Sequence, residues 1–230
     1  MPTLPEIAEQ EHNGIVLFDC SVGSIDYFLE HIFYAGKYAD LDRELLEDKV
    51  KLTGQFLEFV LRENTFTVKA AILDFKSVYD RTRYKHSYFN DRKKKMNGHA
   101  NFKKYNSSAA EAEKDSLFGQ IAANISEIYM AVRFHKLFIP DNIEVYGRLY
   151  EEIPKILGSG ASRQELNPRH RELYAAALYS LTQKPVNLIV AGRDFSKGLI
   201  FLIESSCLKQ HPISLYFMDY EGNYNIAYRA

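Results

Sequence analysis

Cysteine is scarce in this chain, which has only Cys20 and Cys207 among its 230 residues. Two cysteines cannot build a disulfide framework or, by themselves, a thiolate zinc site. No apolar run approaches the roughly 18 residues of a transmembrane helix, and the N-terminus lacks the basic start and apolar stretch of a signal peptide. These absences predict a cytoplasmic protein in a reducing compartment, with no membrane contact.

Acidic residues are nearly absent from the stretch 81–106, where Asp91 is the only one. This stretch has a formal charge of +8, whereas the rest of the chain carries 20 basic and 29 acidic residues. A basic segment on an acidic body predicts contact with a polyanion such as a nucleic acid. Its nine basic residues are Arg81, Arg83, Lys85, Arg92, Lys93, Lys94, Lys95, Lys103 and Lys104.

Aromatic side chains alternate with these basic residues, at Tyr84, Tyr88, Phe89, Phe102 and Tyr105. Aromatic rings can stack on unpaired bases, while lysine and arginine hold the phosphates. The segment therefore predicts binding of single-stranded nucleic acid. A solvated loop whose basic residues have no specific partner is the alternative.

Three apolar runs, 14–19, 65–73 and 186–191, predict buried neighbouring strands of one mostly parallel sheet. Apolar residues at helical spacing between these runs predict helices on both faces of the sheet. Residues 213–228 alternate around Glu221-Gly222-Asn223 and predict an antiparallel hairpin at the sheet margin. The predicted helices span 25–34, 40–63, 116–138, 142–157, 168–183 and 199–207.

The whole chain, 1–230, is predicted to form a single α/β domain, because its length suffices for one large core. Within it, 80–115 is predicted to be a basic insertion that is partly helical or mobile. Asp115 or Ser116 is the expected N-cap of the helix that follows. Asn167-Pro168 is a strong helix start, and Pro154 predicts a kink or an early helix end.

Carboxylates follow the predicted strands. Asp19, Asp74 and Asp194 each lie at or just after a strand end, and Glu172 lies near the start of the helix that leads into the third strand. If the strands are parallel, all four acids reach the same edge of the sheet. Four carboxylates at one place repel one another unless a hard cation such as Mg²⁺ or Mn²⁺ lies between them. The alternative role for Asp19 is a simple helix cap.

The order of these features resembles the PIN domain family. Leu17-Phe18-Asp19-Cys20-Ser21 matches the family's hydrophobic-Asp-small-Ser/Thr opening, and the row Ala175-Ala176-Ala177-Leu178 and Arg193-Asp194-Phe195 follow in the expected order. The resemblance covers roughly 14–79 and 166–205. It implies a compact α/β fold and a magnesium- or manganese-dependent endoribonuclease acting on single-stranded RNA.

The resemblance also implies the catalytic residues and the partners. Strict counting from the alanine row puts His170 at the third acid position, with Glu172 as the nearest carboxylate, and Val190-Ala191-Gly192 replaces the family's closing Thr-Asn-Asp. A non-catalytic PIN-like module that binds RNA or a protein is therefore the alternative. Many members are toxins with antitoxin partners, so the resemblance also allows a homodimer or an inhibitory protein partner. The implied catalytic and metal-binding residues are Asp19, Asp74, Glu172 and Asp194.

Overall fold

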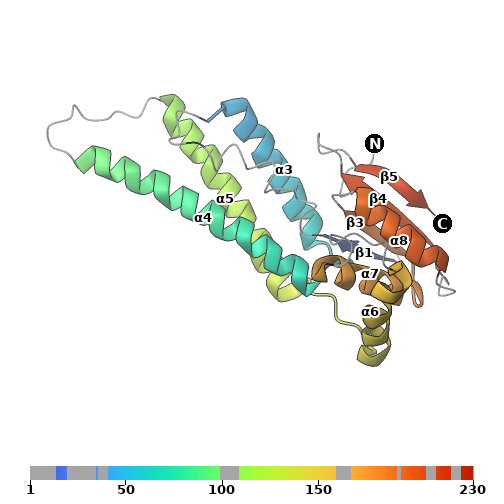
Figure 1. Ribbon diagram of the computed structural model, residues 1–230. Helices are drawn as coiled ribbons and strands as arrows, with labels where there is room; N and C mark the ends of the chain where they lie inside the picture. The colour runs from blue at the N-terminus through green and yellow to red at the C-terminus, as the bar shows by residue number, and fades with distance from the viewer. Residues whose placement is uncertain are drawn as a thin grey trace.

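The computed structural model describes residues 14–19, 35, 41–98, 109–158, 167–190, 193–205, 211–218 and 224–229, and shows an α/β fold (Figure 1). The strands are β1 (Ile15–Phe18), β2 (Thr65–Phe66), β3 (Val186–Val190), β4 (Ile213–Met218) and β5 (Tyr224–Arg229). The helices are α3 (Arg43–Leu61), α4 (Lys69–Gly98), α5 (Ala109–His135), α6 (Ile143–Leu157), α7 (Pro168–Leu181) and α8 (Arg193–Ser205). The helix predicted at 25–34 lies outside the described residues.

The five strands form one sheet in the order β2-β1-β3-β4-β5. β1 is parallel to both of its neighbours, and Leu17 pairs with Phe66 on one side and with Leu188 on the other. β3 is also parallel to β4, whereas β4 and β5 form an antiparallel pair at the margin. The predictions of a mostly parallel sheet and of a C-terminal hairpin are confirmed.

The strand predicted at 65–73 is wrong beyond Phe66. The backbone of Thr67 exchanges hydrogen bonds with the segment after α5, donating to Lys136 O (2.7 Å) and accepting from Phe138 N (2.7 Å). Helix α4 then begins at Lys69, in a stretch of alanine, leucine and lysine that favours a helix once the β-branched residues have ended. Asp74 therefore lies inside α4 and not at a strand end.

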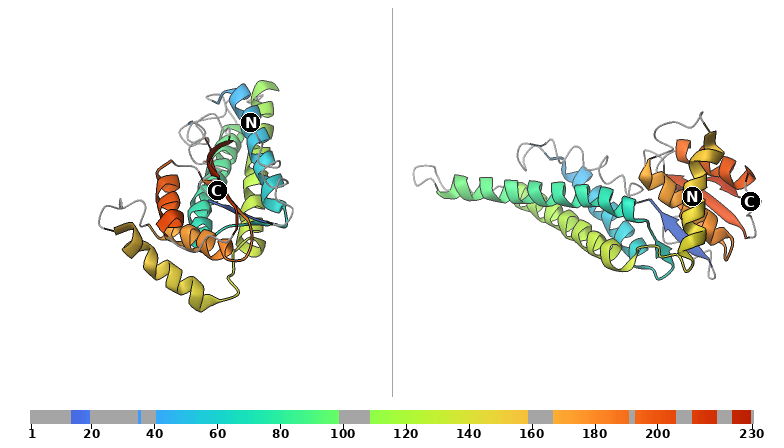
Figure 2. Two further views of the ribbon diagram at one scale, coloured as in Figure 1. Left: turned by 90° about the vertical axis from the view of Figure 1, so that its right-hand side faces the viewer. Right: turned by 60° about the horizontal axis from the view of Figure 1, so that its bottom comes forward.

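Helices α3, α4 and α5 form a helical arm that projects from the sheet (Figures 1 and 2). The insertion predicted at 80–115 is largely helical, since α4 continues to Gly98 and α5 begins at Ala109. The predicted N-cap at Asp115 or Ser116 is therefore wrong, because the alanine- and glutamate-rich residues before it extend α5 towards its N-terminus. Ring stacking of Tyr79 on Tyr129, with centroids 4.5 Å apart, holds α4 to α5.

Two predicted helix starts are confirmed by capping hydrogen bonds. The Asn142 side chain accepts from Val145 N (3.1 Å) at the start of α6. The Asn167 side chain accepts from His170 N (2.9 Å) at the start of α7, with Pro168 in the first helical position. Pro154 lies inside α6, which ends at Leu157, near the predicted boundary.

The sheet and the arm share one hydrophobic core. All four residues of β1 are buried although their side chains alternate between the two faces, so both faces of this strand are covered. Phe18 packs edge-on against Phe56 and Phe59 of α3, with ring centroids 5.9 Å and 5.4 Å away. Among the helices that the structure describes, none is long and apolar enough to cross a membrane.

Candidate functional site

Asp19 lies where the sequence places it, directly after β1 at the carboxyl edge of the sheet. Its backbone N–H donates to Ile189 O (3.0 Å), so the residue continues the pairing between β1 and β3. The side chain is only 4% exposed. The hydroxyl of Thr67 donates to Phe18 O (2.7 Å) and holds the chain after β2 against the same edge. A buried acid is thus fixed at the position where open α/β sheets bind ligands.

Arg169, in the first turn of α7, connects the first two predicted acids. Its Nε lies 3.5 Å from Asp19 Oδ2, and its Nη1 donates to Asp74 Oδ2 at 2.7 Å. Asp74 thus comes to the predicted edge, but from α4 and with its side chain 58% exposed. Sequence reasoning missed this arginine, although its place two residues after the Asn167 cap fixes it at the helix start. The guanidinium of Arg169 therefore lies between the two carboxylates.

Glu172 lies three residues after Arg169, on the same face of α7. Its Oε2 accepts a hydrogen bond from Ala70 N (2.8 Å) in the first turn of α4. This contact satisfies one of the backbone donors that every helix start leaves without an intrahelical partner. Oε1 makes no hydrogen bond within the described part of the chain. Glu172 therefore reaches the carboxyl side of β2, where it orders α4.

As their described side chains lie, Asp19, Asp74 and Glu172 do not form a cation site. Asp19 and Asp74 face Arg169, and Glu172 bonds to a backbone N–H, whereas Mg²⁺ and Mn²⁺ need several oxygens pointing at one centre. Within the described residues, no three His, Cys, Asp or Glu side chains are grouped closely enough to hold a metal. Asp194 begins α8 close after β3, and its side chain lies outside the described part.

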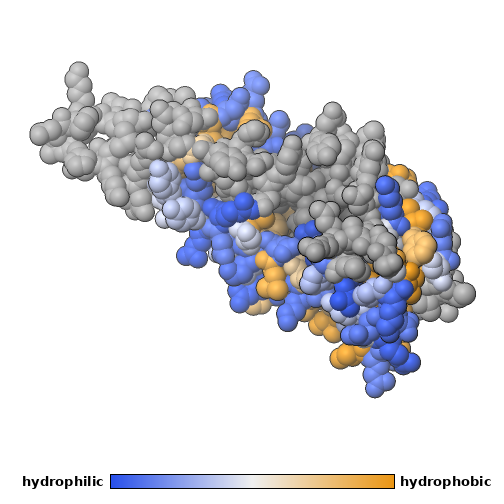
Figure 3. Space-filling model, in the orientation of Figure 1, coloured by the Kyte–Doolittle hydropathy of each residue, from blue (hydrophilic) through white to orange (hydrophobic). Residues whose placement is uncertain are grey.

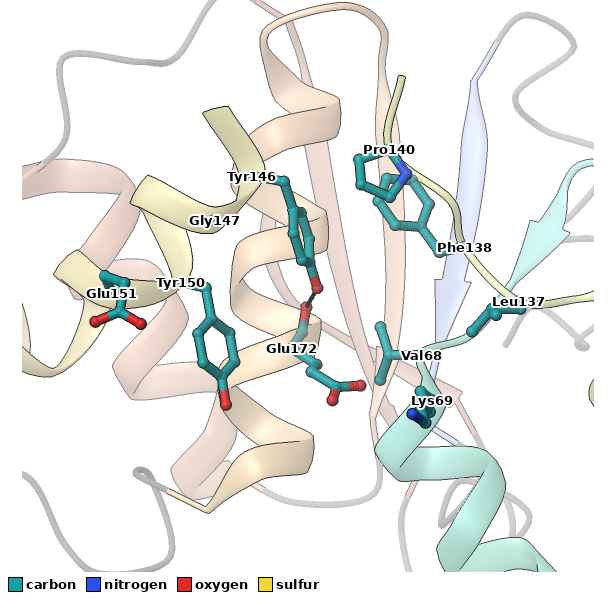
Figure 4. A pocket seen from close by; sticks show the side chains of 10 residues that line it. All are labelled: Val68, Lys69, Leu137, Phe138, Pro140, Tyr146, Gly147, Tyr150, Glu151 and Glu172. Carbon is teal, nitrogen blue, oxygen red and sulfur yellow. Dashed lines mark hydrogen bonds between the residues drawn. The ribbon is translucent and has the colours of Figure 1, made fainter. Parts of the chain in front are cut away.

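A pocket of about 470 Å³ opens between α6, the starts of α4 and α7, and the segment after α5 (Figure 4). The Tyr146 hydroxyl donates to Glu172 O (3.3 Å), and burial, followed by the Glu172 charge, raises the pKa of this phenol. The guanidinium of Arg171 lies 4.1 Å from the centre of the Tyr150 ring. The lining residues are Val68, Lys69, Leu137, Phe138, Pro140, Tyr146, Gly147, Tyr150, Glu151 and Glu172.

Seven of the nine predicted nucleic-acid-binding residues, those from Arg81 to Lys95, lie on α4, in the arm. Arg81 and Arg83 are exposed, and the Lys85 ammonium lies 5.3 Å from the Tyr88 ring centre. Tyr84 is 73% exposed, and the outer side of the arm is mainly hydrophilic on the face in Figure 3. The side chains at Arg92, Lys93, Lys94 and Lys95 and the residues Lys103 and Lys104 lie outside the described part.

The helical repeat aligns part of this surface with the carboxyl edge of the sheet. Asp74, Arg81, Lys85 and Tyr88 recur at spacings of seven, four and three residues, which places them along one flank of α4. We call this line, together with the exposed Tyr84 beside it, the basic flank. It begins at Asp74, next to Arg169, and runs outward along the arm.

No family model, curated protein or solved structure matches this chain. The five-stranded, mostly parallel sheet with its helices is compatible with the α/β fold class that the resemblance implies. The assignment of function therefore depends on the geometry described above.

Proposed function

We propose that this chain is a PIN-like module that binds single-stranded RNA along the basic flank. One end of the binding surface is the strand-edge cluster, formed by Asp19, Asp74, Arg169 and Glu172. The observation that carries the proposal is the alignment of Arg81 and Lys85 with exposed tyrosines on a helix that starts at the sheet edge. Cations hold phosphates, and ring faces accept unpaired bases.

The basic flank has few acidic neighbours in the sequence. No acid occurs between Arg81 and Asn90. By contrast, Lys76, one turn before this stretch, pairs with Asp80. A local excess of positive charge attracts a polyanion, and the release of condensed counterions supplies much of the affinity.

The position of Arg169 is the reason for placing binding ahead of cleavage. A guanidinium beside Asp19 and Asp74 offsets part of the negative charge of the carboxylates that the resemblance implies as metal ligands. These ion pairs hold the two carboxylates near one another without any bound cation. RNA recognition on the basic flank requires no rearrangement there.

The second candidate is the magnesium- or manganese-dependent endoribonuclease that the resemblance implies. The buried position of Asp19 at the end of a central parallel strand, with Asp74 close by, favours it. The proposed metal-binding and catalytic residues are Asp19, Asp74, Glu172 and Asp194. If the protein is this nuclease, a cation between the two aspartates has to share them with the Arg169 guanidinium or displace it.

Binding of labelled single-stranded RNA, followed by fluorescence anisotropy at several salt concentrations, tests the first candidate. Replacing Arg81, Arg83 and Lys85 by alanine should weaken binding similarly for all sequences. The slope of log affinity against log salt should flatten by about 0.7 for each phosphate that the variant no longer neutralises. The same holds for replacement of Arg92, Lys93, Lys94 and Lys95.

A charge-matched control removes three exposed basic residues elsewhere, Lys51 on α3, Arg148 on α6 and Arg229 on β5. The control should keep the wild-type affinity and slope. An equal decrease in affinity in the control and in the arm variant would mean that binding follows net charge alone, and would contradict a dedicated surface on α4.

Incubation of the RNA with the protein and Mn²⁺ separates the two candidates. Binding without cleavage supports the non-catalytic module. Cleavage that the Asp19→Asn variant abolishes supports the nuclease, because a carboxamide keeps the shape of the side chain and removes its charge. Equal cleavage by both proteins points to a contaminating nuclease.

A further inference from the structure

We propose that the pocket between α6 and α7 is a base-specific subsite that takes a guanine of the bound RNA, with the Glu172 carboxylate reading its Watson–Crick edge. This inference deepens the proposed RNA binding and rests on it. The pocket lies beside the strand-edge cluster, because Glu172 is three residues from Arg169 on α7.

The hydrogen-bonding capacity of Glu172 determines which base fits. An ionised carboxylate only accepts, at about four lone-pair positions. Ala70 N occupies one position on Oε2, and Oε1 has no hydrogen-bond partner among the described residues. The carboxylate is half-buried against the pocket, where it orders the start of α4 and keeps accepting positions open towards a ligand (Figure 4).

Guanine is the base with two adjacent donors, N1–H and N2–H, on its Watson–Crick edge. These two groups can bond side by side to one carboxylate, as an arginine does. Adenine presents an acceptor at N1, which a carboxylate repels, and uracil presents one donor between two carbonyls. Cytosine offers a single amino group. The carboxylate therefore favours guanine through both attraction and repulsion.

The walls of the pocket suit a flat ring. Tyr146 and Tyr150 extend from α6 on one side, and Val68, Leu137 and Phe138 lie opposite (Figure 4). Because Tyr146 directs its hydroxyl to Glu172 O, the rest of its ring remains as apolar surface. Arg171 stacks on Tyr150 and also donates to Tyr150 O (3.1 Å), so that this wall is fixed before a ligand arrives.

The rim offers one cation that can meet the phosphate of a nucleotide. The exposed Lys69 stands at the mouth, in the first position of α4, where it can meet the phosphate of a base held by Glu172. Glu151 is also exposed and lies on the far side of Tyr150 from Glu172 (Figure 4). The RNA strand leaving Lys69 can follow α4 towards Arg81 and Lys85.

Isothermal titration of the full chain with GMP, IMP and AMP tests the subsite without RNA. IMP lacks the N2 amino group, so GMP should bind about tenfold more tightly than IMP, the effect of one hydrogen bond to a charged group. AMP should bind still more weakly. Equal affinity for GMP and AMP in the wild-type protein would overturn the proposal, and this comparison needs no variant.

The variant Glu172→Gln sharpens the test. Its amide oxygen can still accept from Ala70 N, whereas its NH₂ group opposes the guanine donors, so the preference for GMP over AMP should vanish while the thermal unfolding midpoint stays near the wild-type value. Glu152→Gln, which changes an exposed carboxylate of α6 outside the pocket lining, is the matched control and should keep the preference. A preference that survives Glu172→Gln assigns the base contact elsewhere and overturns the proposal.

Failure of this inference is distinguishable from failure of the proposed function. RNA binding that depends on Arg81 and Lys85 but shows no preference for GMP leaves the RNA-binding function standing and overturns the subsite. A GMP preference that needs Glu172, in a chain that binds no RNA, retains the pocket and overturns the RNA-binding function.

Discussion

The carboxyl edge of the sheet and the basic flank of α4 use charge in opposite ways. At the edge, Asp19 is 4% exposed and faces Arg169, which also holds Asp74. On the basic flank, Arg81 is exposed, and no acid occurs between Arg81 and Asn90. At the edge, one guanidinium therefore meets two carboxylates of the same protein, whereas the flank beyond Asp74 carries an excess of positive charge that a polyanion can meet.

Because of this difference, the edge should matter mainly for the stability of the fold, and the flank mainly for the binding of RNA. A buried ion pair contributes little net stability when intact, but removing one partner leaves a desolvated charge and is strongly destabilising. Exposed charges change stability little, and their effect appears in affinity and salt dependence. Substitutions in the two regions should therefore have different consequences.

The largest effect is expected for Phe18→Ala, in the strand that carries Asp19. Phe18 is fully buried against Phe56 and Phe59, and loss of such a ring costs about 4 kcal/mol in the free energy of unfolding. Tyr84→Ala, on the exposed flank, should change it by less than about 0.5 kcal/mol. Urea denaturation of both variants measures the contrast. Similar values for the two variants would mean that α3 does not pack on β1 as described.

Next in size is Arg169→Ala, which removes the guanidinium from the buried Asp19. We expect a decrease of about 3 kcal/mol in the free energy of unfolding. Asp74→Ala should cost less than about 1 kcal/mol, because that carboxylate is 58% exposed and its ion pair is screened by water.

Arg83→Ala, at an exposed position of α4, supplies the matched control, with a change near zero in the same urea titration. If Arg169→Ala also left the free energy of unfolding unchanged, the ion pair with Asp19 would not be part of the folded structure in solution. In the double variant Asp19→Asn with Arg169→Ala, the decrease in stability should be smaller than the sum of the two single decreases.

Sequence patterns predicted the secondary structure best where the residues of a segment fit only one kind of element. The apolar run at β1, the alternating hairpin and the Asn167-Pro168 helix start all have local causes and were placed well. The strand expected at 65–73 failed because its β-branched start continues into alanine and leucine, which suit a helix equally well. The end of the strand is set instead by tertiary backbone hydrogen bonds between Thr67 and the segment after α5.

The candidate site could be predicted only in part, for a similar reason. The position of Asp19 follows from where one strand ends, and that of Glu172 follows from the direction of one helix. Both residues therefore lie at the predicted edge. Asp74 reached it from a helix that was not predicted. Arg169 contacts Asp19 because the start of α7 lies close to the end of β1. The spacing of residues along the sequence gives no information about that distance. Tyr146 and Tyr150 likewise become pocket walls only through the packing of α6 on α7.

A smaller effect is expected for Asn167→Ala, which removes the cap of α7. Removal of the hydrogen bond from His170 N should cost about 1 kcal/mol. The same turn holds Arg169, so the substitution should also loosen the edge, seen as faster amide hydrogen exchange in the first turn of α7. Asn142→Ala, which uncaps α6, should have a similar cost without that effect on α7. Equal exchange in α7 for both variants would contradict a link between the cap and the edge.

The smallest effect concerns Tyr146, whose pKa is raised by burial and, to a lesser extent, by the Glu172 charge. Above about pH 10, the ordinary tyrosine pKa, the unfolded chain loses this proton while the folded chain keeps it. The folded state then binds more protons, so this group makes the free energy of unfolding fall as pH rises. Lys85 and Lys136 have the opposite effect, because burial lowers their pKa.

Comparison with Tyr146→Phe isolates the tyrosine, since both lysines are present in the two proteins. Near pH 9 the wild-type protein should be more stable by about 1 kcal/mol, through the hydrogen bond that Tyr146 donates to Glu172 O. Because only the wild type loses stability through this group, the difference should shrink as pH rises towards about 11. Urea titrations at intervals of half a pH unit measure it. A difference that stays constant over this range would show that the Tyr146 phenol is not held in its protonated form by the pocket.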